Sequence, residues 1–215
     1  MSVAANPLPG KLRAIAFDWG GVFTEGTFDS SAHARLAELH GLPATTVEPH
    51  YLHLMESFEV GAYDMAEFHR RFQAAVGGTS SLPDFRAAFL GAVRERPAMY
   101  ELLASLPGNI KVGMLSNNVP ELCDLVRDDP RMQRMQAPVF SNEIGVRKPE
   151  RAAFDALCEA LDLPPEAIVF IDDNAANIAA CNALGFEGLL IDDLPSFAAR
   201  WRAVLPQLAL PQGLT

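Results

Sequence analysis

Short runs of apolar residues that end in polar residues recur along the chain. Residues 15–17, 111–115 and 167–171 are dominated by apolar side chains, and each run is too short for a typical helix. Bounded apolar runs of this length predict buried strands. The residues that follow them are Asp18, then Ser116 and Asn117, then Asp172 and Asp173. In open α/β sheets ligands bind beyond the carboxyl ends of the strands, so we expect these polar residues to share one site.

The segment between the first two predicted strands has a different periodicity. Residues 30–96 contain no strand-like run, and apolar residues recur there at intervals of three and four, which predicts amphipathic helices. Four such sets are Ala32, Leu36 and Leu39; Tyr51, Leu54, Met55 and Phe58; Phe68, Phe72 and Val76; and Phe85, Phe89 and Val93. We therefore expect a helical-bundle cap at 30–96, inserted after the first strand.

From residue 97 onward, strands and helices are expected to alternate. We predict helices at 99–106, 122–127, 149–161, 174–184 and 197–205, and further strands at 139–140 and 188–191. The glycine-containing segment 19–29 is expected to form a mobile loop or a small hairpin over the site. The predicted fold is an α/β domain with a doubly wound, Rossmann-like parallel sheet, formed by residues 11–29 and 97–215, plus the inserted cap.

Composition narrows the class of protein. The chain has 215 residues, of which 49% are hydrophobic and 20% charged, as is common for globular proteins. A net charge of −10 argues against nucleic-acid binding. We find no apolar run long enough for a membrane span and no evident signal peptide. The three cysteines are widely spaced, which favours reduced thiols and a cytoplasmic location. We expect a monomer or a homodimer.

Two residues carry the predicted chemistry. Asp18 ends the first strand and is followed by Gly20 and Gly21, which allow a sharp turn and close approach of a ligand. A carboxylate placed there can be a nucleophile, a metal ligand or both; the alternative is a strand followed by an ordinary turn. Lys148 lies between the second and third apolar runs, just before a predicted helix. A solvated turn lysine is the alternative for Lys148.

Taken in order, these motifs resemble the haloacid dehalogenase (HAD) superfamily, in its helical-cap (C1) group. The resemblance covers roughly residues 13–193 and implies an aspartyl-phosphate mechanism. Asp18 matches the nucleophile, which attacks phosphorus and is then released by water. Ser116 and Asn117 match the motif that holds the phosphoryl group, and Lys148 matches the lysine that offsets charge in the transition state. For Ser116 and Asn117, a simple helix cap is the alternative.

The resemblance also implies a magnesium site. Mg²⁺ prefers oxygen ligands, which Asp18, the Gly20 carbonyl and Asp172 or Asp173 can supply. Both members of the Asp172–Asp173 pair match metal-binding positions, and the sequence leaves open which of them binds directly. The alternative for the pair is a set of carboxylates favoured by a helix N-terminus.

One position departs from the family pattern. Most phosphatases of the family carry a second aspartate two residues after the nucleophile, as a general acid, where this chain has Gly20. A branch with Asp-x-Gly-Gly/Asn-Val shares this feature, and it includes sugar-1-phosphate phosphatases and domains like the N-terminal domain of epoxide hydrolase. Glu25 or an acid from the cap could substitute. Dehalogenases have tyrosine at the Gly20 position, which weakens a dehalogenase interpretation.

Other candidate residues have weaker signals. Trp19 is expected either to contact the substrate or to pack between cap and core. His50 and His53 have a metal-ligand spacing but no evident third ligand. The sequence thus predicts a Mg²⁺-dependent phosphatase of a small phosphorylated metabolite, with a sugar phosphate as one candidate. The alternatives are a weakly active or inactive binding protein of the same fold, and a hydrolase acting on a non-phosphate bond.

Overall fold

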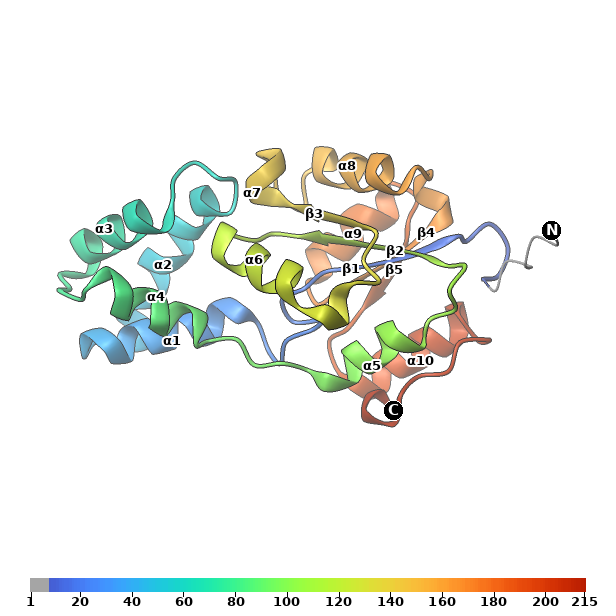
Figure 1. The fold of residues 1–215 in the computed structure, drawn as a ribbon, viewed down its shortest axis with the longest axis horizontal. Helices are drawn as coiled ribbons and strands as arrows, with labels where there is room; N and C mark the ends of the chain where they lie inside the picture. Colours follow the sequence, from blue (N-terminus) through green and yellow to red (C-terminus); the bar gives the residue numbers. More distant parts are fainter. Residues whose placement is uncertain (1–7) are drawn as a thin grey trace.

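A five-stranded parallel sheet forms the centre of the protein. The computed structural model describes residues 8–215. The strands are β1 (Ala14–Phe17), β2 (Lys111–Ser116), β3 (Ala137–Phe140), β4 (Ile168–Asp172) and β5 (Glu187–Leu190), in the order β3-β2-β1-β4-β5 (Figure 1). Phe17 pairs with both Met114 and Ile171, so β1, β2 and β4 end at one edge of the sheet. The predicted α/β fold with a parallel sheet is confirmed.

Alternating residues of the central strand face two separate hydrophobic cores. Ile15 and Phe17 join a core with helices α5 (Pro97–Ser105), α6 (Pro120–Asp128) and α10 (Leu194–Val204). Ala14 and Ala16 join a second core with helices α8 (Arg151–Leu161) and α9 (Ala175–Ala183). Burial on both faces explains why the strand has an unbroken apolar sequence.

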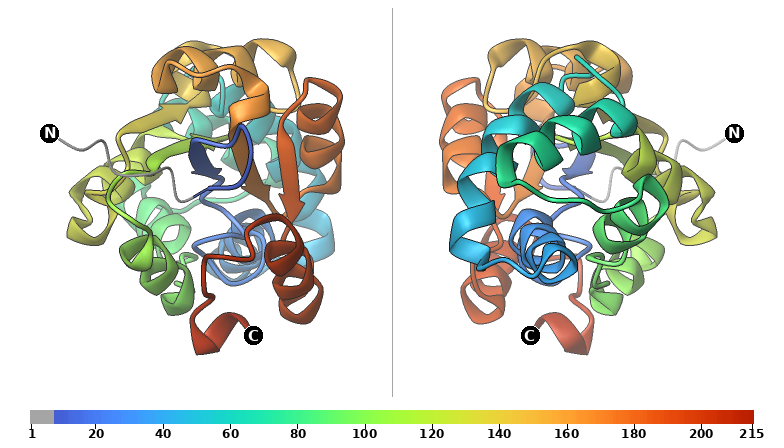
Figure 2. Two further views of the ribbon diagram at one scale, coloured as in Figure 1. Left: turned by 90° about the vertical axis from the view of Figure 1, so that its right-hand side faces the viewer. Right: turned by 90° about the vertical axis from the view of Figure 1, so that its left-hand side faces the viewer.

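Four helices form a separate bundle beyond the carboxyl ends of the strands. They are α1 (Phe28–His40), α2 (Ala44–Phe58), α3 (Met65–Val76) and α4 (Leu82–Leu90), here called the cap. Their buried faces meet in a cluster of aromatic rings that includes Phe58, Phe68, Phe72, Phe85 and Phe89. In the right-hand view of Figure 2 the cap lies in front of the sheet.

The two chain segments that join cap and core are hydrogen-bonded to each other. Thr24 and Glu95 form an antiparallel bridge. Glu25 N donates to Arg94 O at 2.7 Å, and Arg96 N donates to Phe23 O at 2.8 Å. Of the two alternatives for 19–29, the small hairpin is wrong, because Thr24 pairs with a residue some seventy positions further along the chain. Residues 19–26 otherwise form turns and bends, as in a loop. We call residues 23–25 and 94–96 the connecting ribbon.

Some element boundaries differ from the prediction. Helix α8 begins at Arg151 rather than at 149, because Glu150 has an extended backbone. Helix α10 begins at Leu194, where Asp193 caps it by accepting a hydrogen bond from Ser196 N. Short elements that were not predicted are α7 (Ser141–Ile144), η1 (Pro130–Met132), η2 (Pro165–Ala167) and η3 (Gln212–Leu214). No helix within residues 8–215 is both long and apolar enough to cross a membrane.

Candidate active site

Asp18 lies at the carboxyl end of β1, the central strand of the sheet. Its Oδ1 accepts a hydrogen bond from Trp19 N at 2.7 Å and lies 3.0 Å from Lys148 Nζ. The pKa of Asp18 is raised to about 6, chiefly by burial, and the negative charge of the neighbouring Asp172 acts in the same direction. Lys148 and a hydrogen bond with the Ser116 side chain act in the opposite direction. Asp18 is thus a buried carboxyl group whose charge depends on nearby cations.

Asp172 holds Lys148 in place. Lys148 Nζ donates to Asp172 Oδ2 at 2.6 Å, and both groups are buried. Asp172 Oδ1 accepts a hydrogen bond from Asn174 N at 2.8 Å, and Asn177 Nδ2 lies within 3.2 Å of both carboxylate oxygens. Both oxygens of Asp172 are therefore engaged by protein donors, which fixes the side chain.

Asn117 fixes the backbone of Lys148. Asn117 Nδ2 donates to Lys148 O at 3.0 Å, and Lys148 N donates to Asn117 Oδ1 at 2.8 Å. The end of β2 and the loop before α8 are joined by this pair of hydrogen bonds. The Lys148 ammonium group consequently has a defined position between Asp18 and Asp172.

Asp173 completes an acidic cluster. Candidate ligand oxygens of Asp18, Asp172 and Asp173 lie within 4.8 Å of one another. The pKa of Asp173 is raised to about 7, chiefly by burial, and repulsion from Asp18 and Asp172 acts in the same direction. Three carboxyl groups face a single lysine, so a divalent cation would relieve the excess negative charge. The oxygen donors suit Mg²⁺, and these residues fit such an ion.

Gly21 lets the chain pass close to Asp173. Its φ of +70° is unfavourable for other residues, and an added Cβ would lie 1.9 Å from Asp173 Oδ2. We expect Gly21→Ala to lower the free energy of unfolding by about 1–3 kcal/mol. We also expect weaker Mg²⁺ binding, because Asp173 must move. Urea unfolding and calorimetric titration with Mg²⁺ measure both effects.

Gly20→Ala is the matched control for Gly21→Ala. A Cβ on Gly20 meets no atom within 4 Å. We expect this change to alter stability by no more than about 0.5 kcal/mol. Equal stability and Mg²⁺ affinity in the two variants would show that the close approach to Asp173 is unimportant.

A cavity of about 420 Å³ lies beside the acidic cluster. From the core it is lined by Asp18, Trp19, Gly20, Asn117, Asn118, Leu122, Arg147, Lys148, Asp173, Asn174, Ala175 and Asn177. From α1, α2 and their flanking residues it is lined by Thr27, Phe28, Asp29, Met55 and Glu59. The cavity therefore lies between cap and core. Trp19 is buried and packs against Phe28, with ring centroids 6.4 Å apart.

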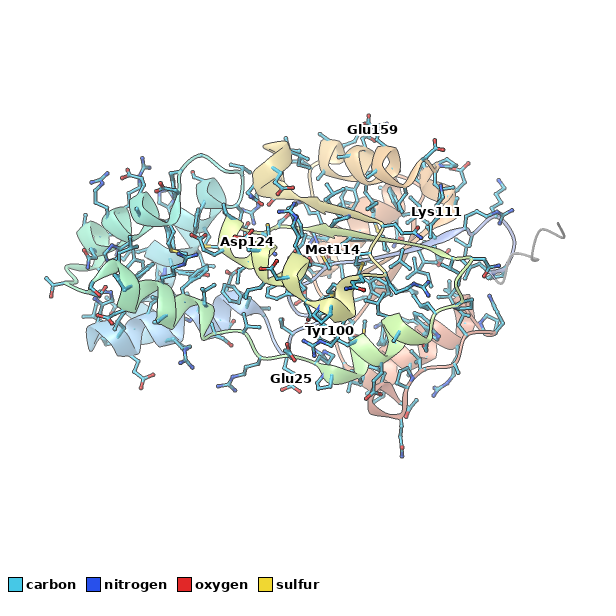
Figure 3. The ribbon with its side chains drawn as sticks, in the orientation of Figure 1. Glu25, Tyr100, Lys111, Met114, Asp124 and Glu159 are labelled. Carbon is cyan, nitrogen blue, oxygen red and sulfur yellow. The ribbon has the colours of Figure 1, made fainter. Side chains whose placement is uncertain are left out.

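Most sequence-predicted site residues converge on this cavity. Asp18, Trp19, Gly20, Asn117, Lys148 and Asp173 line it, whereas Ser116 and Asp172 are buried behind it. His50 and His53 are exposed on α2, and no third metal ligand accompanies them in the described residues. Glu25 is exposed and lines a different cavity; its side chain points away from the sheet in Figure 3.

Seven polar residues that line the cavity were not assigned to the site from the sequence. They are Thr27, Asp29, Glu59, Asn118, Arg147, Asn174 and Asn177. Asn177 had a usable signal, because it lies five residues after Asp172 on the first turn of a helix that starts at the strand end. Asn118, Arg147 and Asn174 are direct sequence neighbours of predicted site residues. Thr27, Asp29 and Glu59 reach the cavity through the packing of cap on core, for which the sequence has no local pattern.

Comparison with known proteins identifies the family. The family model described as haloacid dehalogenase-like hydrolase matches residues 12–185, so this chain belongs to that family of hydrolases. A protein of Mycobacterium tuberculosis named as a phosphatase is 26% identical over 196 residues, covering 84% of this chain and 88% of that protein. A sesquiterpene phosphatase of Aspergillus oryzae is 24% identical over 147 residues, covering 64% of this chain and 72% of that protein.

Solved structures share the fold. A predicted HAD-like hydrolase of Porphyromonas gingivalis is 25% identical and superposes with a TM-score of 0.71, covering 84% of this chain and 91% of that one. A HAD-family enzyme of Bacteroides thetaiotaomicron, solved with magnesium and inorganic phosphate, is 20% identical with a TM-score of 0.69. The coverage is 83% of this chain and 93% of that one.

Proposed function

We propose that this protein is a Mg²⁺-dependent phosphatase that hydrolyses small phosphomonoesters through an aspartyl-phosphate on Asp18. The observation that carries the proposal is the placement of Asp18 at the cavity, 3.0 Å from Lys148 and within one cluster with Asp172 and Asp173. A carboxylate attacks a phosphate monoester only when the repulsion between the two anions is offset, and this site concentrates the groups that offset it.

Each residue of the site has a separate role in the proposed reaction. Asp18 is the nucleophile, and Lys148 stabilises the charge that develops on the phosphoryl oxygens. Ser116 and Asn117 lie at the end of β2 and are proposed to hold the phosphoryl group. Trp19 from the core and Phe28 from the cap shape the cavity.

We assign the metal ligands by asking which carboxylates are not already bound by donors of the protein. Asp172 is engaged by Lys148, Asn174 and Asn177, so we assign it to positioning Lys148. Asp18, Asp173 and the backbone carbonyl of Gly20 would then hold Mg²⁺ most directly. When bound, the ion neutralises charge on the substrate and orients the phosphoryl group. The names of two relatives as phosphatases and the magnesium–phosphate complex of a neighbour support the proposed Mg²⁺-dependent phosphatase function.

The proposal is tested by steady-state hydrolysis of p-nitrophenyl phosphate. We expect turnover with Mg²⁺ and a fall to background when a chelator removes the metal, with recovery when Mg²⁺ is restored. This substrate has a good leaving group, so it tests the nucleophile and the metal together. Absence of turnover under all three conditions would contradict the proposal and favour a ligand-binding role for the cavity.

A further inference from the structure

Expulsion of an alcohol from a phosphomonoester requires a proton donor at the leaving oxygen. Within the proposed phosphatase function, we infer that Glu59 is the general acid and base of the reaction. Glu59 follows the last residue of α2 and lines the same cavity as Asp18 and Lys148. It thus brings a cap carboxyl group into the space where the leaving group must lie.

Contacts with the core hold this end of α2 in place. Ser141 Oγ donates a hydrogen bond to Glu59 O and accepts one from Asn118 N at 2.9 Å. Two residues later, an added Cβ on Gly61 would lie 2.4 Å from Asn142 O, so the backbones are in close contact. The position of Glu59 is therefore fixed against the end of β2 and the start of α7, next to the predicted phosphoryl-binding residues.

The surroundings of Glu59 suit proton transfer. Glu59 is only 6% exposed. The pKa of its carboxyl group is raised to about 8, chiefly by burial, and the charges of Asp29 and Asp18 act in the same direction. Arg147 and Lys148 lower it, and Arg147 Nη2 lies 2.9 Å from Glu59 Oε2. The protonated form is thus available near neutral pH, and Arg147 stabilises the carboxylate left after proton donation.

Other carboxyl groups of the cavity are less suited to this role. Asp29 accepts a hydrogen bond from Tyr51 Oη at 2.8 Å, which engages it within the cap. Asp18 is the nucleophile and Asp173 belongs to the metal cluster. Glu59 Oε2, by contrast, is buried and ion-paired with Arg147, but it makes no hydrogen bond of regular geometry in the part of the chain that the structure describes.

The proposed steps balance in atoms and charge. An Asp18 oxygen forms a bond to phosphorus while the bond from phosphorus to the leaving oxygen breaks, its electron pair staying on that oxygen. The Glu59 carboxyl proton passes to the same oxygen, giving the alcohol and a Glu59 carboxylate. Water then attacks phosphorus, Glu59 takes its proton, and the bond between phosphorus and Asp18 breaks. Phosphate, the Asp18 carboxylate and the Glu59 carboxylic acid are regenerated.

Pre-steady-state kinetics of Glu59→Gln test the inference. Glutamine keeps the size of the side chain and an acceptor for Arg147, but it cannot transfer the proton. With p-nitrophenyl phosphate, we expect a burst of about one p-nitrophenol per enzyme, followed by turnover reduced about 10²–10⁴-fold. Mass spectrometry should find one phosphoryl group on the protein. With phenyl phosphate, a poorer leaving group, we expect the burst itself to slow.

Two further variants separate catalysis from structure. Asp29→Asn tests the other cap carboxyl group of the cavity, and we expect it to show no burst and to accumulate no phosphorylated protein. Adding Gly20→Asp to Glu59→Gln should restore turnover of phenyl phosphate at least about tenfold, because a Cβ there meets no atom within 4 Å and the new carboxyl group faces the cavity.

Failure of this inference differs from failure of the phosphatase function. If wild type turns over with Mg²⁺ but Glu59→Gln slows both leaving groups equally without a burst, Glu59 is not the acid and base. A burst in Asp29→Asn would transfer the role to Asp29. If wild type itself has no metal-dependent turnover, the phosphatase function fails before Glu59 is tested.

Discussion

Replacement of Asp18 by asparagine is expected to reduce the hydrolysis of p-nitrophenyl phosphate on the order of 10⁴-fold or more. The amide is a poor nucleophile and leaves the phosphoryl group without an acceptor. The fold should survive, because asparagine keeps the oxygen that accepts from Trp19 N and removes one of three clustered carboxyl groups. Steady-state kinetics and thermal melting measure both effects.

Asp124→Asn provides the matched control for Asp18→Asn. Asp124 is exposed on α6, where Figure 3 labels it. The same chemical change there should leave turnover unchanged within experimental error. If Asp18→Asn retained more than about a tenth of the wild-type rate, Asp18 would not be the nucleophile.

Replacement of Lys148 by methionine is expected to have the largest effect on stability. The lysine lies 3.0 Å from Asp18 and 2.6 Å from Asp172, and its side chain is almost wholly buried. Methionine leaves the two carboxylates without their shared cation, which should lower the free energy of unfolding by about 3–5 kcal/mol without Mg²⁺. Urea unfolding measures the loss, and we expect added Mg²⁺ to recover part of it.

Lys111→Met is the corresponding control. Lys111 is half-buried on β2, and its Nζ donates a single hydrogen bond to Leu161 O at 2.7 Å. Figure 3 labels it at the opposite end of the strand from the cap. We expect a cost of about 1 kcal/mol that does not depend on Mg²⁺. An equal cost at both lysines would mean that no buried charge is left unpaired when Lys148 is removed.

The sequence predicted the strands and the cap helices because their signals are local. Apolar runs such as 167–171 are bounded by polar residues, and apolar residues recur in the cap helices at intervals of three and four. Asp18 and Asp172 could be placed together because parallel strands end at one edge of the sheet.

What the sequence could not predict depends on contacts between distant residues. Asp172 and Asp173 are adjacent in sequence, yet only the structure shows that Asp172 binds Lys148 while Asp173 faces Gly21. Likewise, Glu59 and Arg147 are brought together only by the packing of cap on core. The pairing of 23–25 with 94–96 is equally non-local, and turn residues in the first segment suggested a hairpin instead.

The connecting ribbon makes the cap a modular insertion. Its two segments are hydrogen-bonded at Glu25–Arg94 and Phe23–Arg96, so the chain leaves the core and returns to it at almost the same point. The separation of these ends is set by the ribbon itself, whatever number of residues lies beyond it. The entropy of closing such a loop grows only slowly with its length. The helices beyond the ribbon can therefore be lengthened, shortened or exchanged without moving the core residues Asp18 and Lys148, while the cap residues that line the cavity change with them.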